Sequence, residues 1–312
     1  MKLPRTIKIS KCRLCSHKKL LKIHSFGNLY VSNFVSKKDV NNGIKAPLNL
    51  VYCKNCKLLQ LQHSAPQEIM YKKFYWYRSG VTATMRNALK DIYKSSLKYI
   101  NLRRNDVVLD IGANDGTLLK YYCNKNVKTI GCEPAKNLVS KLKKNCNYVL
   151  NDFWSYKKLN NMLKKKKLKK PKIITAIGMF YDLENPNKFI RDSALALDKR
   201  GIFIAQLMCL KSMIDKNDIG NICHEHIEFY SLKSLKYLFE SNGLEIFKIE
   251  ENDINGGSYR IFCRKLNKGS IKLAKENVLT SVKKFVKRVT KNKSITMKFI
   301  NKEIQRGKKI FL

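Results

Sequence analysis

The sequence is poor in acidic residues and in long apolar runs. It has 23 Asp and Glu against 64 Lys and Arg among 312 residues, so its formal net charge is +41. No run approaches the ~18 consecutive apolar residues that a transmembrane helix needs, so we expect no membrane span. Residues 1–11 lack the apolar segment of a signal peptide, and we therefore expect a cytoplasmic protein.

The excess of basic residues has two explanations, which the sequence leaves open. Lys is spread along the whole chain together with many Asn and Ile, as compositional drift in an AT-rich coding sequence would produce. Alternatively, the charge attracts an anionic partner such as nucleic acid or a nucleotide-bearing substrate. Because the basic residues are not gathered in one patch, we do not expect nucleic acid to be the partner.

Histidine is scarce, with five residues, whereas ten cysteines are present. In a reducing compartment disulfides are not expected, so metal binding or simple burial accounts better for the cysteines. Two C-x-x-C pairs are formed by Cys12, Cys15, Cys53 and Cys56. Four thiolates in two close pairs suit a tetrahedral zinc ion. The sequence therefore predicts a structural zinc site in a small N-terminal domain, with four unrelated cysteines as the alternative.

Residues 107–119, VVLDIGANDGTLL, combine an apolar strand, a glycine-rich turn and the start of a helix. Such a turn presents backbone N–H groups to a nucleotide-like ligand, and glycine lets the ligand approach the backbone closely. The turn has the pattern D-x-G-x-x-x-G, which differs from the G-x-G-x-x-G fingerprint of dinucleotide-binding proteins. The residues concerned are Asp110, Gly112, Asn114 and Gly116.

A second apolar strand, 127–132, ends at Glu133-Pro134. A carboxylate about 20 residues after the turn suits the two hydroxyls of an adenosine ribose. Together, the turn and this acid resemble the first two motifs of class I S-adenosylmethionine-dependent methyltransferases. The resemblance implies that the residues after the third strand read the adenine, with a solvated loop as the alternative. These residues are Asn151, Asp152 and Phe153.

Strand and helix patterns alternate between residues 105 and 230. The expected strands are 106–111, 127–132, 148–150, 172–177 and 201–207, and the expected helices are 117–125, 136–144, 154–165 and 187–197. This order predicts an α/β protein with a parallel, doubly wound sheet that binds ligands at the carboxyl ends of its strands. The elements expected after it are a helix at 232–241, strands at 244–250 and 258–263, and a basic amphipathic helix at 271–300. We expect that last helix to pack on its own domain or a neighbour, with a membrane surface as the alternative.

The segment 221–231, NICHEHIEFYS, holds two of the five histidines beside two carboxylates. Its spacing differs from the H-E-x-x-H of zinc proteases. A histidine next to an acid is suited to general-base catalysis, because its pKa lies near neutral pH and the carboxylate can orient the ring. A polar turn without a function is the alternative.

The order of the motifs resembles that of the C-methyltransferases that act on keto sugar nucleotides in deoxysugar pathways. The motifs are the paired C-x-x-C, Tyr-x-Tyr-x-Ser at 75–79, D-I-G-x-N-D-G-T at 110–117, E-P at 133–134, C-H-E-H at 223–226 and N-G-G-S-x-R at 255–260. The resemblance implies a class I methyltransferase Rossmann-like sheet with a small N-terminal zinc-binding domain. It also implies S-adenosyl-L-methionine as cofactor, a structural zinc ion, and a 4-keto sugar linked to a nucleoside diphosphate as substrate.

The same resemblance assigns roles to single residues. His226 would be the base that removes a proton next to the keto group, with Glu225 orienting the ring or sharing the proton. Tyr75 or Tyr77 would donate to the enolate oxygen, and Cys223 belongs to the same catalytic group. The residues expected beside the substrate are His224, Asn255, Gly256, Gly257, Ser258 and Arg260, of which the arginine suits a phosphate.

Two features depart from the family pattern. Cys223 stands where family members have a tyrosine that is thought to be part of their active site, so the substrate or the proton route is expected to differ. Family members also continue into a C-terminal domain, whereas residues 307–312 read like its opening strand, with 310–312 exposed for a partner that would supply the domain. Two alternatives therefore stay open: a methyltransferase for RNA or another small molecule, and a truncated remnant that binds the cofactor without turnover.

Four segments follow from these patterns. We expect a zinc-binding domain at 1–70, a tyrosine-containing segment and linking helix at 71–102, a methyltransferase domain at 103–265 and a basic helical tail at 266–312. The tyrosines before the linking helix either pack in the core or cover a ligand, because a phenol has both an apolar face and a hydrogen-bonding group.

Overall fold

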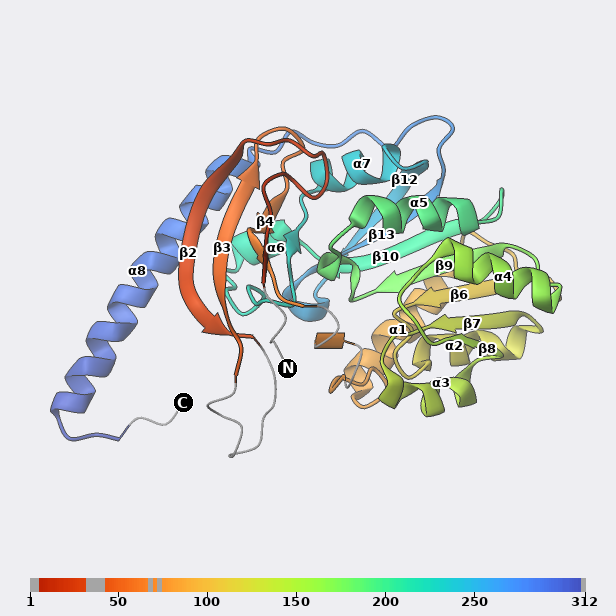
Figure 1. Ribbon diagram of the computed structural model, residues 1–312, viewed down its shortest axis with the longest axis horizontal. Helices are drawn as coiled ribbons and strands as arrows, with labels where there is room; N and C mark the ends of the chain where they lie inside the picture. The colour runs from red at the N-terminus through yellow and green to blue at the C-terminus, as the bar shows by residue number, and fades with distance from the viewer. Residues whose placement is uncertain (1–5, 32–42, 67–69, 72–74, 310–312) are drawn as a thin grey trace.

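The computed structural model describes residues 6–31, 43–66, 70–71 and 75–309 (Figure 1). These residues form a seven-stranded sheet flanked by helices, a four-stranded antiparallel sheet, and a two-stranded pair of β1 (Ile7–Lys8) with β5 (His63–Ser64). Figure 1 shows the two larger sheets side by side, with the long helix α8 (Val278–Gln305) along the outer side of the four-stranded sheet.

The seven-stranded sheet has the strand order β12-β13-β10-β9-β6-β7-β8. Its strands are β6 (Val107–Ile111), β7 (Lys128–Cys132), β8 (Tyr148–Leu150), β9 (Pro171–Ile177), β10 (Ile202–Met208), β12 (Leu244–Asn252) and β13 (Ser258–Lys265). The strands β6 to β10 are parallel, as predicted, whereas β13 runs antiparallel to both of its neighbours. The chain continues to β7 on one side of β6 and later to β9 on the other, and ligands bind at such a switch point.

Helices cover both faces of this sheet (Figure 1). They are α1 (Ala83–Leu97), α2 (Thr117–Tyr122), α3 (Val139–Asn145), α4 (Tyr156–Lys166), α5 (Pro186–Ala196) and α7 (Leu232–Glu240). Short 3-10 turns are η3 (Cys123–Lys125), η4 (Lys136–Leu138), η5 (Phe180–Asp182) and η6 (Ile254–Gly256). In β6, Val107 and Leu109 share a core with α4, α5 and α7, whereas Val108 shares a core with α1, α2 and α3. A strand that is buried on both faces reads as a continuous apolar run.

The four-stranded sheet combines the N-terminal region with a strand from the middle of the chain. Its order is β11-β4-β3-β2, formed by β2 (Leu20–Tyr30), β3 (Lys45–Cys53), β4 (Leu59–Leu61) and β11 (Glu228–Phe229). The strand β11 follows directly after the C-H-E-H block and pairs with β4. The core under this sheet also contains residues of α6 (Leu210–Asp215) and α8. The N-terminal region therefore holds the C-H-E-H block in place.

The predicted strands of the larger sheet are confirmed with small shifts at their ends, whereas several helix boundaries were wrong, including the end of the last helix, which is Gln305 and not 300. The helix predicted to run from 117 to 125 ends at Tyr122 and is followed by η3. The helix predicted from 154 begins at Tyr156, because Ser155 is still extended. The helix predicted from 271 begins at Val278, where the Asn277 side chain accepts a hydrogen bond from the backbone of Thr280.

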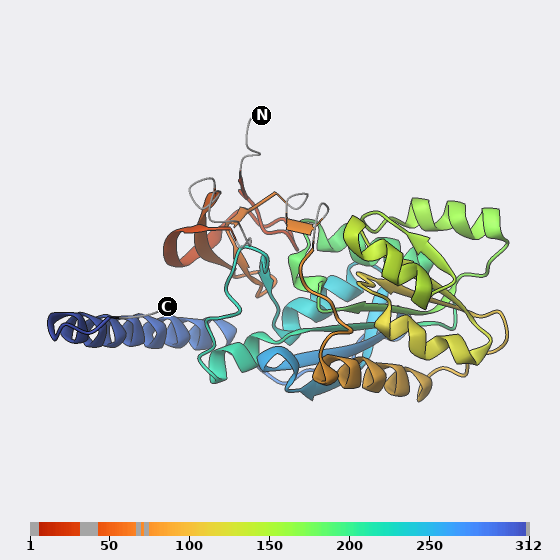
Figure 2. The ribbon, with the colours of Figure 1, turned by 90° about the horizontal axis from the view of Figure 1, so that it is seen from below.

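The helix α8 packs on the rest of the chain through its first half. The buried apolar residues of that half are Val278, Val282, Phe285 and Val289. Its second half extends beyond the rest of the described chain (Figures 1 and 2) and exposes apolar residues such as Phe299. Among the described residues, none of the helices combines the length and apolar character needed to cross a bilayer. The strand predicted at 310–312 lies outside the described residues.

Candidate active site and metal centre

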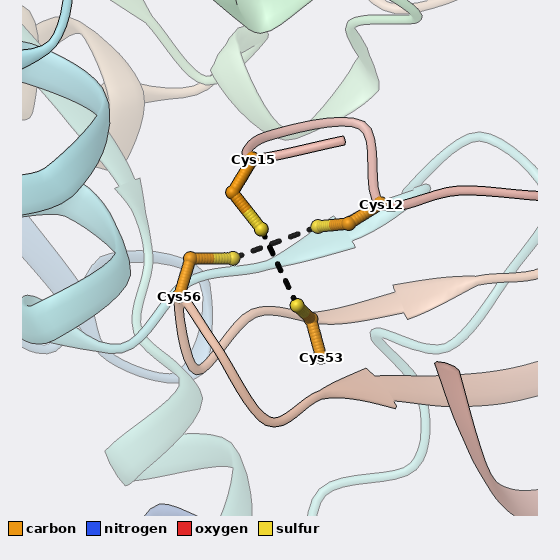
Figure 3. A group of neighbouring side chains, drawn as sticks. All are labelled: Cys12, Cys15, Cys53 and Cys56. Atoms are coloured by element: carbon orange, nitrogen blue, oxygen red, sulfur yellow. Dashed lines mark hydrogen bonds between the residues drawn. The ribbon is translucent and has the colours of Figure 1, made fainter. Parts of the chain in front are cut away.

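The four predicted cysteine ligands converge beside the four-stranded sheet (Figure 3). Their sulfur atoms all lie within 4.8 Å of one another. The Sγ atoms of Cys12 and Cys56 are 3.5 Å apart, and so are those of Cys15 and Cys53. A tetrahedral zinc ion with Zn–S bonds of about 2.3 Å places its sulfur ligands about 3.8 Å apart. The spacing and the four sulfur donors therefore fit a closed structural zinc site.

Both C-x-x-C pairs adopt the same turn. The backbone N–H of Ser16 donates to the Cys12 carbonyl, and that of Lys57 donates to the Cys53 carbonyl, both at 3.0 Å. Ser16 and Lys57 both have positive φ, 56° and 65°. The hydrogen bond from the Cys56 thiol lowers the pKa of Cys12 to about 5 against the opposing effect of burial, whereas burial raises the pKa of Cys53 to about 11. A lowered pKa favours the thiolate, which is the form that binds a metal.

The backbone of the glycine-rich turn after β6 has positive φ angles, which favour glycine and asparagine. Gly112 and Gly116 have φ of 71° and 80°, and Asn114 has φ of 53°. A Cβ on Gly112 would lie 2.7 Å from Cγ of Met179, so a larger residue would displace that side chain. The turn therefore keeps open the space at the carboxyl ends of β6 and β9, where a cofactor of the predicted kind would lie.

Two buried carboxylates flank this turn. Asp110 accepts a 2.6 Å hydrogen bond from Thr175, and burial raises the pKa of Asp110 to about 7. Glu133 accepts hydrogen bonds from the backbone N–H groups of Asn114 and Ala135, both at 2.9 Å, and burial raises its pKa. Each oxygen of a carboxylate can accept a second hydrogen bond. Glu133 is thus held rigidly and still suits the hydroxyls of a ribose.

The three residues predicted to read adenine lie in different surroundings. Phe153 lines the cavity described below. The Asn151 amide donates to the backbone carbonyls of Glu133 and Pro134, at 2.8 Å and 3.3 Å. Asp152 forms an ion pair with Lys158. In the structure Asn151 therefore holds the loop after β7 in place, and of the three only Phe153 borders the cavity.

One cavity of about 760 Å³ is lined both by predicted cofactor residues and by predicted catalytic and substrate residues. Its volume is in the range that holds a small-molecule ligand. The predicted cofactor residues that line it are Asp110, Gly112, Asn114, Glu133, Pro134 and Phe153. The predicted catalytic and substrate residues that line it are Tyr75, Tyr77, His226, Asn255 and Ser258. A ligand bound at the turn would therefore lie in the same chamber as the histidine.

The tyrosine-containing segment is fastened to the cofactor turn through its backbone. The Asn137 side chain accepts from the N–H of Tyr75 at 3.1 Å and donates to its carbonyl at 3.0 Å. The Asn114 side chain donates to the Tyr77 carbonyl at 3.1 Å and accepts from the Ser79 N–H at 3.0 Å. Asn114 was predicted as a cofactor residue, and the structure adds this second connection. The phenols are consequently positioned over the cavity.

Among the residues that the structure describes, Nδ1 of His226 has a hydrogen-bond partner and Nε2 has none. Its Nδ1 lies 2.9 Å from the carbonyl oxygen of Asn221. A carbonyl only accepts, so Nδ1 carries the proton and Nε2 keeps a free lone pair. Burial lowers the pKa of His226 below its ordinary value, which favours the neutral ring. The ring also packs edge-on against Tyr181, with 4.6 Å between the centroids. His226 thus has the tautomer and protonation state of a general base.

Cys223 and Glu225 lie next to His226. One ligand atom of each of the three residues lies within 4.8 Å of the others. Burial raises the pKa of Glu225 and raises that of the Cys223 thiol to about 11. The predicted role of Glu225, to orient the imidazole or share its proton, stays a prediction.

Several residues that line the cavity were not predicted, among them Tyr71, Tyr181 and Asp182. Asp182 is half-buried, and loss of solvation followed by the nearby carboxylate of Glu225 raises its pKa well above the ordinary value. The Tyr71 hydroxyl donates to the Glu225 backbone carbonyl at 3.2 Å, which links the tyrosine segment to the C-H-E-H block. Tyr181 and Asp182 lie just after β9. The rule that ligands bind at the carboxyl ends of parallel strands would have indicated this position.

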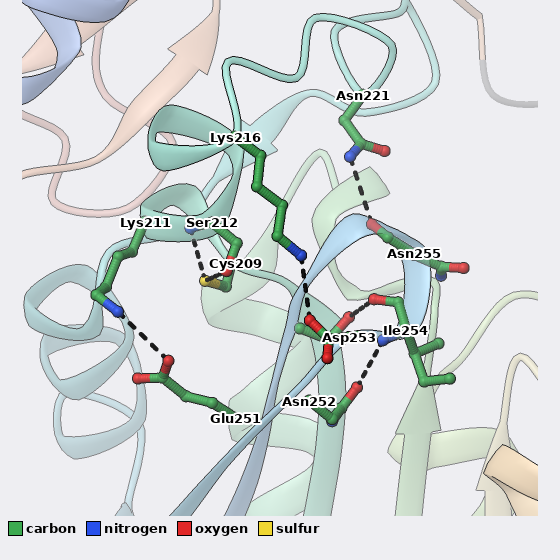
Figure 4. Close-up of polar contacts among 11 residues, drawn as sticks. Cys209, Lys211, Ser212, Lys216, Asn221, Glu251, Asn252, Asp253, Ile254 and Asn255 are labelled. Carbon is green, nitrogen blue, oxygen red and sulfur yellow. Dashed lines mark hydrogen bonds and ion pairs between the residues drawn. The ribbon is translucent and has the colours of Figure 1, made fainter.

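The N-G-G-S turn lies beside the cavity. Figure 4 shows that Asn221 contacts Asn255 of the turn and that Lys216 contacts the nearby Asp253. Asn255 and Ser258 line the cavity, whereas Gly256 and Gly257 shape the turn. Gly257 has φ of 128°, and a Cβ there would lie 2.4 Å from Cβ of Ser212 in α6. The Asn221 amide donates to the Asn255 carbonyl at 3.5 Å, which connects the turn to the loop that carries His226.

Two residues predicted to contact the substrate do not line the cavity and instead form hydrogen bonds with other parts of the protein. Nε2 of His224 is 3.0 Å from the carbonyl of Ala46 in β3, and the side chain is buried. The Arg260 guanidinium is buried and bonds to four side chains. They are Asp91 at 2.7 Å, Gln206 at 2.9 Å, Ser95 at 3.0 Å and Glu250 at 3.3 Å. These contacts indicate that both residues join elements of the fold.

Comparison with known proteins identifies the class. Residues 81–249, more than half of the chain, match the methyltransferase domain family, and the chain belongs to this family. It is an S-adenosylmethionine-dependent methyltransferase with the Rossmann-like sheet of class I, so the predicted fold, enzyme class and cofactor are confirmed. Residues 12–71 match a zinc binding domain, which agrees with the four-cysteine site.

Individual relatives are distant. The chain is 23% identical over 257 residues to the C-methyltransferase NovU of Streptomyces niveus. The match covers 82% of this chain and 60% of NovU, so the chain spans less than two thirds of the length of that relative. A solved methyltransferase in complex with the Trm112 activator of Haloferax volcanii is similar at 12% identity and a TM-score of 0.45, over 59% of this chain and 95% of that one. The magnesium protoporphyrin IX methyltransferase of Synechocystis PCC 6803 is similar at 11% identity and 0.43, over 58% and 79%.

Proposed function

We propose that this enzyme methylates a carbon atom of a keto sugar nucleotide through an enolate intermediate. The observation that carries the proposal is the state and position of His226. Its ring is neutral with a free lone pair on Nε2, and the residue lines the same cavity as the cofactor turn. The similarity to a protein named as a C-methyltransferase supports transfer to carbon. A carbon atom next to a keto group becomes a nucleophile only when a base removes its proton, and a buried imidazole is suited to that task.

The base would work as follows. Nε2 of His226 takes the proton, while Nδ1–H remains bonded to the Asn221 carbonyl and keeps the ring in position. The imidazolium that forms is disfavoured by burial. The Glu225 carboxylate, within 4.8 Å, would offset this cost. The pair therefore holds the proton during the reaction and releases it afterwards.

The enolate oxygen needs hydrogen-bond donors, and the tyrosine segment supplies them. Burial raises the pKa of both Tyr75 and Tyr77, so the two phenols stay protonated and can donate. Their backbones are held by Asn137 and Asn114, which positions the phenols before substrate binds. Donors that are already in place stabilise developing charge without reorganisation.

The cofactor would be held by the glycine turn and by Glu133. When bound there, S-adenosylmethionine supplies an electrophilic methyl group. The contribution of the chain is to hold the enolate carbon in line and to exclude water, which is how positioning accelerates a transfer between two bound molecules. Apolar side chains of the cavity, including Met179 and Trp154, serve the second purpose.

We also propose the division of the chain into the segments expected from the sequence. The zinc-binding region would be 1–70, the tyrosine segment and α1 71–102, the cofactor-binding region 103–265 and the basic tail 266–312. The matched ranges 12–71 and 81–249 support the first boundary.

Hydrogen–deuterium exchange at the sugar tests the proposal directly. The protein is incubated in deuterated water with S-adenosylmethionine and several nucleoside-diphosphate-linked 4-keto sugars, and mass spectrometry records deuterium and methyl groups in each sugar. We expect exchange at the carbon next to the keto group, and His226→Gln should slow it by about 100-fold or more, because a general base contributes 10²–10⁴-fold.

His24→Gln is the matched control, because His24 lies on β2 and does not line the cavity. It should leave the exchange rate unchanged. Exchange that survives His226→Gln would remove His226 from the role of base. The absence of exchange and methylation with every sugar, while the cofactor binds, would overturn the keto-sugar proposal.

A further inference from the structure

The C-H-E-H block brings three metal-binding atoms of different kinds together. One donor atom each of Cys223, Glu225 and His226 lies within 4.8 Å of the other two. Sulfur, carboxylate oxygen and imidazole nitrogen are the three donor types that zinc binds in proteins. All three side chains are half-buried. They come from one short loop, so a small adjustment of its side chains is enough to close them around an ion.

The histidine already has the outer hydrogen bond that metal ligands commonly have. Its Nδ1–H donates to the backbone carbonyl of Asn221 at 2.9 Å, which orients the ring and leaves the Nε2 lone pair for a metal. Histidine ligands usually donate their second ring N–H to a carbonyl or carboxylate in this way. The Asn221 side chain is in turn fixed by Asp218, at 2.7 Å. The ring is therefore already held in one orientation by the backbone of its own loop.

The surroundings of the trio are rich in carboxyl groups. Asp182 is half-buried, lines the same cavity as His226 and interacts electrostatically with Glu225. A divalent cation would stabilise this group of carboxyls, because buried charges of one sign repel each other. His226 and Asp182 both line the large cavity, so a water molecule or a ligand atom has access to a further coordination position.

We propose that Cys223, Glu225 and His226 form a second metal site, which takes a thiophilic divalent cation such as zinc. Three protein ligands and one position open to the cavity distinguish it from the closed four-cysteine site. The binding itself does not depend on the reaction proposed above. If that reaction is correct, the cation occupies the lone pair that His226 uses as a base, and the loaded site is an inhibited form of the enzyme.

Cobalt titration tests the site without any assay of activity. The full chain, with zinc in the four-cysteine site, is titrated with Co²⁺ while absorbance and protein-bound zinc are followed. We expect one Co²⁺ per chain to bind with a thiolate-to-cobalt charge-transfer band and without release of zinc. Cys223→Ser should abolish the band. Glu225→Gln and His226→Gln should each weaken binding by more than about 100-fold, because loss of an outer hydrogen bond alone costs 10–100-fold.

Cys123→Ser is the matched control, because Cys123 is exposed and lies after α2, and it should leave the titration unchanged. A band that persists in Cys223→Ser, or the absence of a second bound ion, would overturn the proposal. If Cys223→Ser does not fold, the two other variants decide the result in the same way. Zinc should slow sugar exchange by the native protein over the same concentration range in which it fills the second site, and exchange that is unaffected when the site is full would contradict the inhibited form.

Discussion

At the scale of single residues, the neighbours of His226 set its pKa and its tautomer. A histidine in water is about half protonated near pH 6.5, and only its neutral form can accept a proton. Burial lowers the pKa of this ring, and the hydrogen bond to Asn221 counteracts the shift without cancelling it. The same hydrogen bond selects the tautomer. The residue type was visible in the sequence, whereas its charge and tautomer come from its neighbours.

The lowered pKa predicts the pH dependence of sugar exchange. Exchange needs neutral His226, so its rate should be constant at neutral pH and fall as the pH drops through the pKa of this ring. Because burial places that pKa below 6.5, the midpoint should lie below pH 6.5. Rates measured from about pH 5 to about pH 8 should fall about tenfold per pH unit below the midpoint.

Glu225→Gln removes another group that could titrate in this range, because burial raises the pKa of Glu225 above its ordinary 4.5. A fall in rate at low pH that remains in this variant does not come from Glu225. A midpoint above pH 6.5 in the native protein, or loss of this fall in Glu225→Gln, would contradict the assignment.

At the scale of elements, β11 connects the zinc region to the catalytic loop. It begins two residues after His226 and pairs with β4 through Glu228 and Phe229. Arg13, between two zinc ligands, donates to the Leu61 carbonyl of β4 at 2.6 Å. Asn187 of α5 donates to the carbonyls of Arg13 and Leu14, at 3.0 Å and 2.8 Å. The zinc site thus supports the strand that positions the base.

Loss of structural zinc should therefore affect catalysis more than cofactor binding. Cys53→Ser removes one ligand, and the small sheet should then lose order, because structural zinc contributes directly to folding. We expect sugar exchange to slow by more than about tenfold, while affinity for S-adenosylmethionine changes by less than about threefold. Calorimetry and the exchange assay measure the two quantities.

Cys123→Ser again serves as the control, and zinc content is measured in both proteins. Equal losses of cofactor binding and exchange in Cys53→Ser would show that the whole chain depends on the zinc site. Unchanged exchange in a zinc-free protein would show that β11 holds its position without the metal.

At the scale of the whole molecule, Arg260 joins α1 to two strands of the large sheet. Its side chain is 4% exposed, and it bonds to Asp91 of α1, Glu250 of β12 and Gln206 of β10. Asp91 is 62% exposed, so part of the interaction is screened by water. The sequence predicted that this arginine binds a phosphate, and the structure gives it a connecting position.

Arg260→Met should thus lower the free energy of unfolding by about 2–3 kcal/mol, because a buried hydrogen bond between charged groups contributes about 1.5–3 kcal/mol. Urea denaturation measures this loss. Lys211→Met is the matched control, because Lys211 and Glu251 form an exposed ion pair at 3.5 Å, which is worth about 1 kcal/mol or less. A normal unfolding midpoint combined with a raised substrate KM in Arg260→Met would instead favour phosphate binding.

The parts of the site that were predictable are those coded by neighbouring residues. The cysteine pairs and the glycine turn have local spacing, and the structure brings both sets together as expected. Tyr181 and Asp182 carry no such pattern, because only their place after β9 makes them cavity residues. The contacts of Arg260 were not predictable for the same reason: the four side chains that its guanidinium bonds to come from distant segments.

The sequence by itself determined the order of strands and helices, the zinc ligands and the cofactor turn, because periodicity and short-range spacing specify them. Only the tertiary structure decided which polar side chains reach the cavity and which hold elements together. It also decided the antiparallel β13, the pairing of β11 with the N-terminal sheet, and the neutral state of His226. The physical reason is that burial and hydrogen-bond partners depend on residues far apart in the chain, which meet only when it folds.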